Sequence, residues 1–333
     1  MSSRFSKIKL DKIYIFSVSS YELGLGHKLR CEKLKNNLSK KKHFVRHFNL
    51  ELKKKDLLKQ KKFFFENIFF FQRKNNSIII LDLTNKNFIK KKDVELLKKN
   101  FSLAKNVIII DDPSSINLSN KLKLKNLKYI YPYDLILSQK KKLKSIPKKV
   151  IGFKYFIHSI PKKKISNTKK IKNKNILITF GGSDLTHKTK YILNLIKDLK
   201  LSSEYKVKII LGKYFKKNYK EVIKRISYQN NFRILNFKKN INFNNIKYLI
   251  TNSGLTKYEA LFYKINIIVF SDSKASFKID KIFSLKYEQS VFSYKKNYFK
   301  DINKLKNIFL NDKEINIKPY NFNFLYKFIV SSE

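Results

Sequence analysis

NILITFGGSDLTHK, residues 175–188, joins an apolar run to two glycines and then to a polar segment. A short run that is apolar on both faces is typical of a strand in a parallel sheet covered by helices. Apolar side chains then recur at helical spacing across residues 188–199, at Ile192, Leu195, Ile196 and Leu199. The stretch therefore predicts a strand, a glycine loop and a helix, which together form the repeating unit of an α/β fold.

The same pattern recurs along the whole chain. Short β-branched runs predict strands at 12–20, 77–83, 106–112, 134–138, 175–180, 205–211, 231–235, 247–251 and 265–270. Amphipathic, lysine-rich segments lie between them, such as residues 91–103 with Val94, Leu97 and Phe101 on one face. The low-complexity stretch FFFENIFFF (63–71) predicts a helix or loop packed against the core.

A lysine-rich segment, PKKKISNTKKIKNK (161–174), interrupts the alternation and predicts a linker. It separates an N-terminal domain (1–160) from a C-terminal domain (175–333), each of ordinary size. We therefore predict an α/β protein with two doubly wound, Rossmann-like domains. Their ligands are expected in the central cleft, beyond the C-terminal ends of the strands.

The net charge is strongly positive, with 75 Lys and Arg against 24 Asp and Glu and a formal charge of +51. Only six of these cations are arginines, and the chain is also rich in Asn, Ile, Phe and Tyr, the residues of A/T-rich codons. Proteins that bind phosphate backbones favour the bidentate guanidinium of arginine. The charge is therefore explained by codon bias, and we predict no specific nucleic-acid partner.

Cysteine content and hydropathy indicate the compartment. Cys31 is the only cysteine, so no internal disulfide can form, which fits a reducing environment. No run approaches the ~20 apolar residues of a membrane span, and the N-terminus lacks the features of a signal peptide. We expect a cytoplasmic, monomeric protein without a transmembrane segment.

The loop FGGSDLTHK (180–188) follows a predicted strand and precedes a helix. Its polar and glycine residues are Gly181, Gly182, Ser183, Asp184 and Thr186. Amides and hydroxyls at a helix N-terminus bind anions, so the loop is a candidate phosphate site. The alternative is an ordinary helix cap by Ser183 or Asp184.

A second loop, TNSGLTKYEA (251–260), repeats this layout. Ser253 and Gly254 follow a strand, and Thr256 and Glu259 lie in the first turns of a helix. Two such loops in one domain favour a nucleotide site over two coincidental caps, with the Glu259 carboxylate accepting ribose hydroxyls. The glycines at 152 and 212 are predicted only to make tight turns.

GLGHKLRC (24–31) holds two of the seven glycines, Gly24 and Gly26, around His27. It is neither a P-loop nor a dinucleotide fingerprint. A metal site is disfavoured because no second ligand lies at ligand spacing, and His43 and His47 are surrounded by cations. A helix N-terminus disfavours a cation, so His27 is predicted to present a neutral imidazole that can accept a proton. The alternative is that His27 caps the helix.

Three motifs in this order resemble one family. They are Gly24-x-Gly26-His27-x-x-Arg30-Cys31, Phe180-Gly181-Gly182-Ser183-Asp184 and Gly254-Leu255-Thr256-x-Tyr258-Glu259-Ala260. Together they resemble the nucleotide-sugar hydrolase of pseudaminic acid biosynthesis and the related spore-coat polysaccharide proteins. Further matches are Asp82, the pair Asp111-Asp112, and Gly152-Phe153-x-Tyr155. The resemblance runs from about residue 12 to about residue 290.

The resemblance implies a GT-B fold, akin to that of the lipid II N-acetylglucosaminyltransferase, and hydrolysis of a UDP-linked diacetamido-trideoxy sugar to free sugar and UDP. His27 would be the general base for water, and the glycine-loop amides would stabilise the departing UDP. The substrate-binding residues implied are Gly24, Gly26, Arg30, Asp82, Gly181, Gly182, Ser183, Asp184, Ser253, Gly254, Leu255, Thr256 and Glu259. No metal or other cofactor is implied. Arg30 would contact phosphate or form a salt bridge, and Cys31 would be a small buried residue.

The chain departs from the family at the sugar end of the site. Phe16 and Val18 replace an Arg-x-Asp pair, Thr84 replaces an aromatic residue, and His158 replaces an arginine. The Asn-Gln pair usual after the last core strand is absent from SDSKASFKID (271–280). Two alternatives therefore stay open: a GT-B glycosyltransferase that uses a sugar or lipid hydroxyl in place of water, and a catalytically inactive binder of a nucleotide sugar or polyanion.

Overall fold

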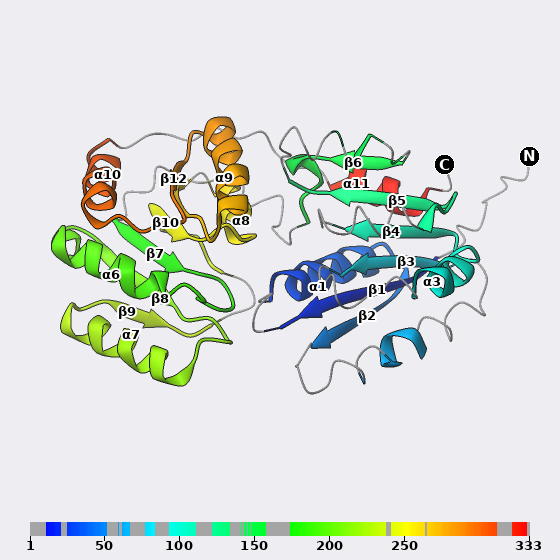
Figure 1. Cartoon of the computed structure of the whole chain (residues 1–333), viewed down its shortest axis with the longest axis horizontal. Coiled ribbons are helices and arrows are strands. Elements are labelled where there is room, and N and C mark those ends of the chain that lie inside the picture. The colour runs from blue at the N-terminus through cyan, green and yellow to red at the C-terminus, as the bar shows by residue number, and fades with distance from the viewer. Residues whose placement is uncertain are drawn as a thin grey trace, which may run out of the picture.

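Two parallel sheets, each with helices packed on it, make up the molecule (Figure 1). This computed structural model describes residues 11–20, 25–51, 59, 62–66, 77–83, 93–110, 122–133, 141, 143–144, 146, 148–157, 174–237, 241–263, 265–311 and 322–331.

The first sheet has the strand order β2-β1-β3-β4-β5-β6, with every pair parallel. Its strands are β1 (Lys12–Ser19), β2 (Phe44–Glu51), β3 (Ser77–Asp82), β4 (Asn106–Ile110), β5 (Leu127–Tyr131) and β6 (Lys149–Ile151). Helices α1 (Gly26–Ser39) and α3 (Asp93–Phe101) and the 3₁₀ turn η2 (Phe153–Tyr155) connect or follow them. The strands predicted at 12–20 and 77–83 are confirmed, as is 106–112 up to Ile110. The predicted strand 134–138 lies outside the described residues.

The second sheet has the order β12-β11-β10-β7-β8-β9 and is also parallel. Its strands are β7 (Asn175–Thr179), β8 (Lys206–Ile210), β9 (Arg233–Leu235), β10 (Tyr248–Thr251), β11 (Asn266–Phe270) and β12 (Ser290–Phe292). Its helices are α6 (Lys188–Asp198), η4 (Leu201–Ser203), α7 (Lys217–Gln229), α8 (Thr256–Leu261), α9 (Lys274–Tyr287) and α10 (Tyr298–Leu310). All five strands predicted in this half are present. The predicted α/β class with two doubly wound domains is confirmed.

The order of strands reverses once in each sheet. From β1 the chain adds β2 on one side and then β3 on the other, and from β7 it adds β8 and β9 before β10 returns to the opposite side. In doubly wound sheets, ligands bind beyond the carboxyl ends of the strands at such reversals. The topology therefore directs attention to the loops after β1, β3, β7 and β10.

The last helix, α11 (Phe322–Val330), packs on the first sheet (Figure 1). Its Leu325 and Ile329 are fully buried in the apolar cluster that covers β1, β3 and β4. The Lys128 ammonium donates to the carbonyl of Phe328 at 2.8 Å. The range 175–333 predicted for the C-terminal domain therefore does not hold at its end, because helical periodicity does not indicate which sheet a helix covers.

A cluster of aromatic side chains joins the two domains. The ring centroids of Tyr133 and Tyr258 are 5.0 Å apart, and those of Phe153 and Phe262 are 5.1 Å apart. All four belong to one buried apolar cluster that draws on both sheets. Phe64, from the stretch 63–71, also packs there, 5.3 Å from the Phe16 ring. Within the described residues, no helix is both long and apolar enough to cross a bilayer.

Candidate active site

A cavity of about 590 Å³ opens between the domains, a volume typical of small-molecule sites. The N-terminus of α1 forms one wall, and the loops after β7 and β10 form the opposite one. The predicted site residues that line it are Gly26, His27, Arg30, Gly181, Gly182, Ser183, Ser253, Gly254, Leu255, Thr256 and Glu259. The structure thus brings together three motifs that are far apart in the sequence. Gly24 lies outside the described residues. Asp82 and Asp184 are buried and do not line the cavity.

His27 is held by a carboxylate from a neighbouring strand. Its Nδ1 is 2.7 Å from Oδ1 of Asp82, which ends β3 and is fully buried. Nδ1 also lies 3.0 Å from Nη2 of Arg30, which can only donate. Because the shorter contact is with Asp82, and an ionised carboxylate only accepts hydrogen bonds, we assign the proton to Nδ1 and the lone pair of the neutral ring to Nε2. The alternative that His27 caps α1 is wrong, since Leu25 is the N-cap residue and no side chain caps the helix.

Arg30 secures Asp82 from the same helix face. Its Nε donates to Oδ2 at 2.9 Å and its Nη2 donates to Oδ1 at 2.6 Å, a bidentate pair, while Nη1 donates to the hydroxyl of Tyr133. The Arg30 side chain is 1% exposed. Of the two predicted roles for Arg30, the salt bridge is present, and its guanidinium is turned to Asp82 rather than presented to a ligand.

The protonation of Asp82 follows from these contacts. Burial alone raises the pKa of a carboxyl group, but the Arg30 guanidinium and then the His27 imidazole more than offset it and hold the pKa of Asp82 well below its usual range. Cys31 donates its thiol to Oδ2 at 3.3 Å, and burial, followed by the Asp82 charge, raises the pKa of that thiol. Cys31 is therefore the small buried residue that was predicted, and a protonated one.

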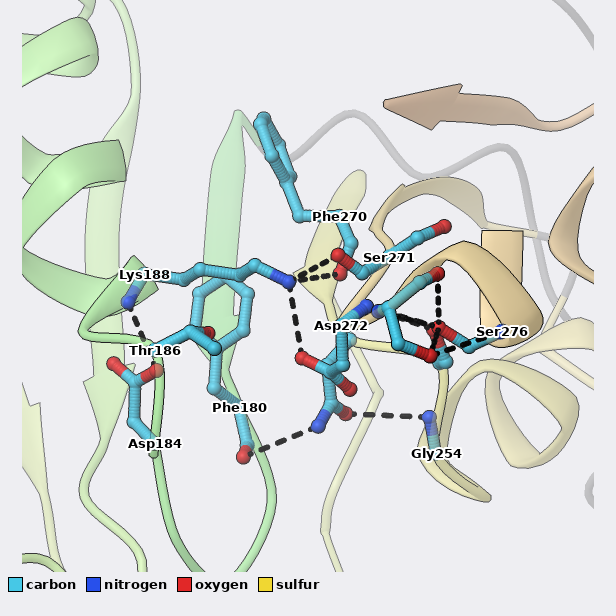
Figure 2. A network of polar contacts seen from close by, with 12 residues as sticks. Phe180, Asp184, Thr186, Lys188, Gly254, Phe270, Ser271, Asp272 and Ser276 are labelled. Atoms are coloured by element: carbon cyan, nitrogen blue, oxygen red, sulfur yellow. Dashed lines mark hydrogen bonds and ion pairs between the residues drawn. The ribbon is translucent and has the colours of Figure 1, made fainter. Parts of the chain in front are cut away.

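The two glycine loops are joined by Asn252, which sequence reasoning did not single out. Its Nδ2 donates to the carbonyl of Phe180 at 3.5 Å, and its Oδ1 accepts from the amide of Gly254 at 3.3 Å (Figure 2). The side-chain amide therefore fixes the spacing between the loop after β7 and the loop after β10. An asparagine at a strand end beside a serine and glycine was the available signal.

Gly212 packs directly against the backbone of the first glycine loop. A Cβ atom on Gly212 would lie 2.2 Å from the carbonyl oxygen of Gly181 and 2.4 Å from that of Gly182. Both contacts are with backbone, so neither can move aside cheaply. The prediction that Gly212 only makes a turn is therefore wrong, because the missing side chain of Gly212 allows close backbone packing. Gly152 has a positive φ of 111°, a conformation that favours glycine.

Gly212→Ala is expected to push the loop at residues 181–182 out of the cavity wall. Overpacking of this kind costs about 1–3 kcal/mol of unfolding free energy, so the variant should melt several degrees lower in a thermal scan. UDP affinity should fall with it, because the loop amides move. Ser202→Ala, at an exposed position in the same domain, serves as the control; a Gly212→Ala protein with unchanged melting and UDP affinity would contradict the packing argument.

Asp184 and Lys188 anchor the same loop. Asp184 accepts from the amides of Lys188 at 2.8 Å and Thr189 at 2.7 Å, in the first turn of α6. The Lys188 ammonium is buried and donates to the carbonyl of Phe270 at 3.2 Å, to that of Ser271, and to Oδ1 of Asp272 at 3.0 Å. Figure 2 shows Lys188 spanning from α6 to the end of β11 in this way. Asp184 thus holds the helix start, as the capping alternative proposed, and does not line the cavity.

The second loop is anchored by a buried ion pair. Lys257 pairs with Oδ1 of Asp280, and both side chains are at most 1% exposed. Oδ2 of Asp280 accepts from Ser253 at 2.5 Å and from Ser271 at 2.6 Å. The Ser253 hydroxyl therefore donates to Asp280 in this structure.

Glu259 has a partner in the other domain. Its Oε1 pairs with the ammonium of Lys33, and the two side chains are 16% and 10% exposed. His27, Arg30 and Lys33 are spaced three residues apart on α1, so all three lie on its cleft-facing side. Sequence reasoning missed Lys33, although this spacing was visible.

The other two histidines near the N-terminus have separate partners. The His43 Nε2 lies 2.9 Å from the Tyr326 hydroxyl, and the His47 Nε2 lies 2.7 Å from the Ser17 hydroxyl. Burial lowers the pKa of His47 to about 4, so this imidazole is neutral near pH 7. Among the residues that the structure describes, no group of three His, Cys, Asp or Glu side chains converges as a metal would need.

The departures from the family pattern fall into two groups. Phe16 and Val18 point into the apolar cluster on the face of β1 away from α1, whereas Ser17 shares the face of Asp82. These two residues are therefore core residues here and do not border the cavity. The departures Thr84 and His158 lie outside the described residues, as does the matching pair Asp111-Asp112.

No family model matches the chain. Over 283 residues it is 26% identical to the uncharacterized protein MJ1062 of Methanocaldococcus jannaschii, a match covering 78% of this chain and 55% of that protein. The chain thus spans little more than half the length of that relative.

Solved structures show the same architecture. UGT89C1 of Arabidopsis thaliana, in complex with UDP-L-rhamnose, matches with a TM-score of 0.54 and 11% identity over 91% of this chain and 90% of its own. A Listeria monocytogenes protein assigned as a UDP-N-acetylglucosamine 2-epimerase matches with a TM-score of 0.52 and 10% identity, over 91% and 89%. Two doubly wound domains that face a cleft make this chain a protein of the GT-B fold class, as the resemblance implied.

Proposed function

We propose that the chain hydrolyses a UDP-sugar, with His27 as the general base. One observation carries the proposal: a carboxylate-oriented imidazole at the strand reversal of the first sheet and two glycine loops at the strand reversal of the second border one cavity. An imidazole held at Nδ1 by a carboxylate offers Nε2 as a base. Backbone amides in a glycine loop after a strand can donate to a diphosphate and stabilise its charge.

The nucleotide belongs on the C-terminal domain in this proposal. The amides of Gly181 and Gly182 are the candidates for the diphosphate, and Glu259 is the candidate for the ribose hydroxyls. The two GT-B structures described above, whose names refer to UDP-L-rhamnose and UDP-N-acetylglucosamine, support a UDP-sugar as the ligand class. The sugar then extends toward the N-terminus of α1 and His27.

The reaction proceeds by attack of water on the anomeric carbon. Nε2 of His27 takes a proton from the water as its oxygen bonds to that carbon. The bond from the anomeric carbon to the diphosphate oxygen breaks, and UDP leaves with the electron pair, which the loop amides stabilise. Asp82 stabilises the imidazolium that forms, since its charge is held in place by Arg30.

The resemblance supports a particular substrate, a UDP-linked diacetamido-trideoxy sugar of the pathway to pseudaminic acid and surface glycans. Arg30, Cys31 and the loop residues of all three motifs carry it. On this proposal the protein works in the cytoplasm as a monomer.

A glycosyltransferase is the second candidate. The same imidazole could deprotonate a sugar or lipid hydroxyl instead of water, and the fold similarity to UGT89C1 in its complex with UDP-L-rhamnose favours this reading. The chemistry at the anomeric carbon is the same in both reactions, so only the identity of the nucleophile separates them.

A panel of UDP-, GDP- and CMP-sugars tests the proposal. The purified protein is incubated with each, and nucleotide release is followed by NMR, which also reports the anomer formed. We expect release of UDP from a diacetamido-trideoxy sugar without any added acceptor. Release only when an acceptor is present would establish the transferase, and release from none of the substrates in either condition would contradict both.

A further inference from the structure

The cations that line the cavity differ in whether their partners can be exchanged. Arg30 and Lys257 are paired with Asp82 and Asp280, carboxylates that are fully buried and do not line the cavity. Moving either cation would leave a buried carboxylate uncompensated, at a cost of several kcal/mol. Neither cation is therefore available to a ligand.

Lys33 is different, because its partner is itself part of the cavity wall. Glu259 lines the cavity and is 16% exposed, and the ion pair spans from α1 of one domain to α8 of the other. The Glu259 carboxylate can therefore exchange the Lys33 ammonium for hydroxyl donors of a ligand and still keep a hydrogen-bond partner. Among the described residues that line the cavity, Lys33 is the ammonium that can change partner at low cost.

We propose that Lys33 is a diphosphate-binding residue that Glu259 holds in reserve until the nucleotide arrives; this rests on the proposed function. When UDP enters, the ribose hydroxyls donate to Glu259 in place of Lys33. The ammonium then turns to the diphosphate, so every charge keeps a partner. As UDP departs, Lys33 stabilises the charge that accumulates on the leaving diphosphate.

Lys33→Met separates binding of the diphosphate by Lys33 from binding of the ribose hydroxyls by Glu259. Affinity for UDP, measured by calorimetry, should fall by about 10- to 100-fold, the range for losing a hydrogen bond to a charged group. Affinity for uridine should not fall, because uridine has no diphosphate and no longer competes with Lys33 for Glu259. Lys35→Met removes the same charge from an exposed position of α1 and is the matched control.

Glu259→Gln tests the exchange from the other side and does not depend on the stability of the Lys33 variant. It should weaken uridine binding, because a neutral amide accepts hydroxyl hydrogen bonds less strongly. It should also strengthen binding of inorganic pyrophosphate, because Lys33 has lost its charged partner. Pyrophosphate affinity that stays unchanged or falls would overturn the inference.

The outcomes separate this inference from the proposed function. If wild-type protein binds no UDP, the proposed function fails and the inference fails with it. If wild-type protein binds UDP but Lys33→Met binds it equally well, or Lys35→Met loses as much affinity as Lys33→Met, only the inference is overturned. A selective loss of UDP affinity in Lys33→Met, with uridine affinity retained, supports it.

Discussion

His27→Asn is expected to lower turnover of the UDP-sugar by about 10²–10⁴-fold, the range for removal of a general base. Asparagine can still contact Asp82 but cannot accept a proton from water. UDP affinity should stay within about twofold of wild type by calorimetry, because the nucleotide loops belong to the other domain. The thermal midpoint should change little, since the imidazole is partly exposed and caps no helix.

His187→Asn is the matched control for this variant. His187 lies on the surface of the second domain in a left-handed conformation that asparagine tolerates, so the same substitution there should leave turnover intact. A His27→Asn protein that melts earlier but still hydrolyses its substrate at the wild-type rate would show that His27 is structural.

Arg30→Met should be the most destabilising of the substitutions considered. It leaves Asp82 charged, buried and without its bidentate partner, and breaking a buried pair in this way costs about 3–5 kcal/mol. Chemical denaturation should show the loss as a lower midpoint, and Arg225→Met, at an exposed position, should show none. An Arg30→Met protein of wild-type stability would contradict the role given to this ion pair.

The double variant Arg30→Met/Asp82→Leu separates stability from catalysis. Replacing both members of a buried pair with apolar residues is often neutral, so much of the lost stability should return. Turnover should not return, because His27 has then lost the carboxylate that fixes its protonated nitrogen. Recovery of turnover together with stability would mean that Asp82 has no part in the reaction.

Stability should also depend on acid through Asp82. Its folded-state pKa lies below that of an unfolded aspartate, which is about 3.9, so the unfolded chain binds more protons as pH falls. The contribution of Asp82 is therefore fully present above about pH 5 and is lost progressively below it. In Asp82→Asn this acid-dependent component should be missing from a plot of unfolding free energy against pH between about 5 and 2.

Much of the fold could be predicted because its strands are apolar on both faces. Residues 77–83 and 175–180 read as buried strands without any tertiary information. The strand β2 was missed because FVRHFNLE mixes charged and apolar residues, and its polar side chains bond to β1, as Asn49 does to Ser17 and Ser19. The placement of α11 was missed because it depends on which sheet has an apolar face left for the helix to bury, and the sequence does not indicate this.

The candidate site was predictable in part for a similar reason. Glycine and polar residues at strand ends mark the loops, so His27 and both glycine loops could be singled out. Their partners could not, because Lys33 with Glu259 and Arg30 with Tyr133 join elements far apart in sequence. Such pairings are set by how the two domains face each other, which no local pattern encodes.

Isotope labelling of the products tests the central claim most directly. The reaction is run in H₂¹⁸O with the UDP-sugar that the panel identifies. Free sugar and UDP are then separated, and the ¹⁸O content of each is measured by mass spectrometry. Attack of water on the anomeric carbon with His27 as base predicts no ¹⁸O in UDP, with both products greatly reduced in His27→Asn. The free sugar also gains ¹⁸O, but its anomeric oxygen exchanges with solvent, so UDP is the deciding product. Label in the diphosphate of UDP would show that water attacks phosphorus and would contradict the account.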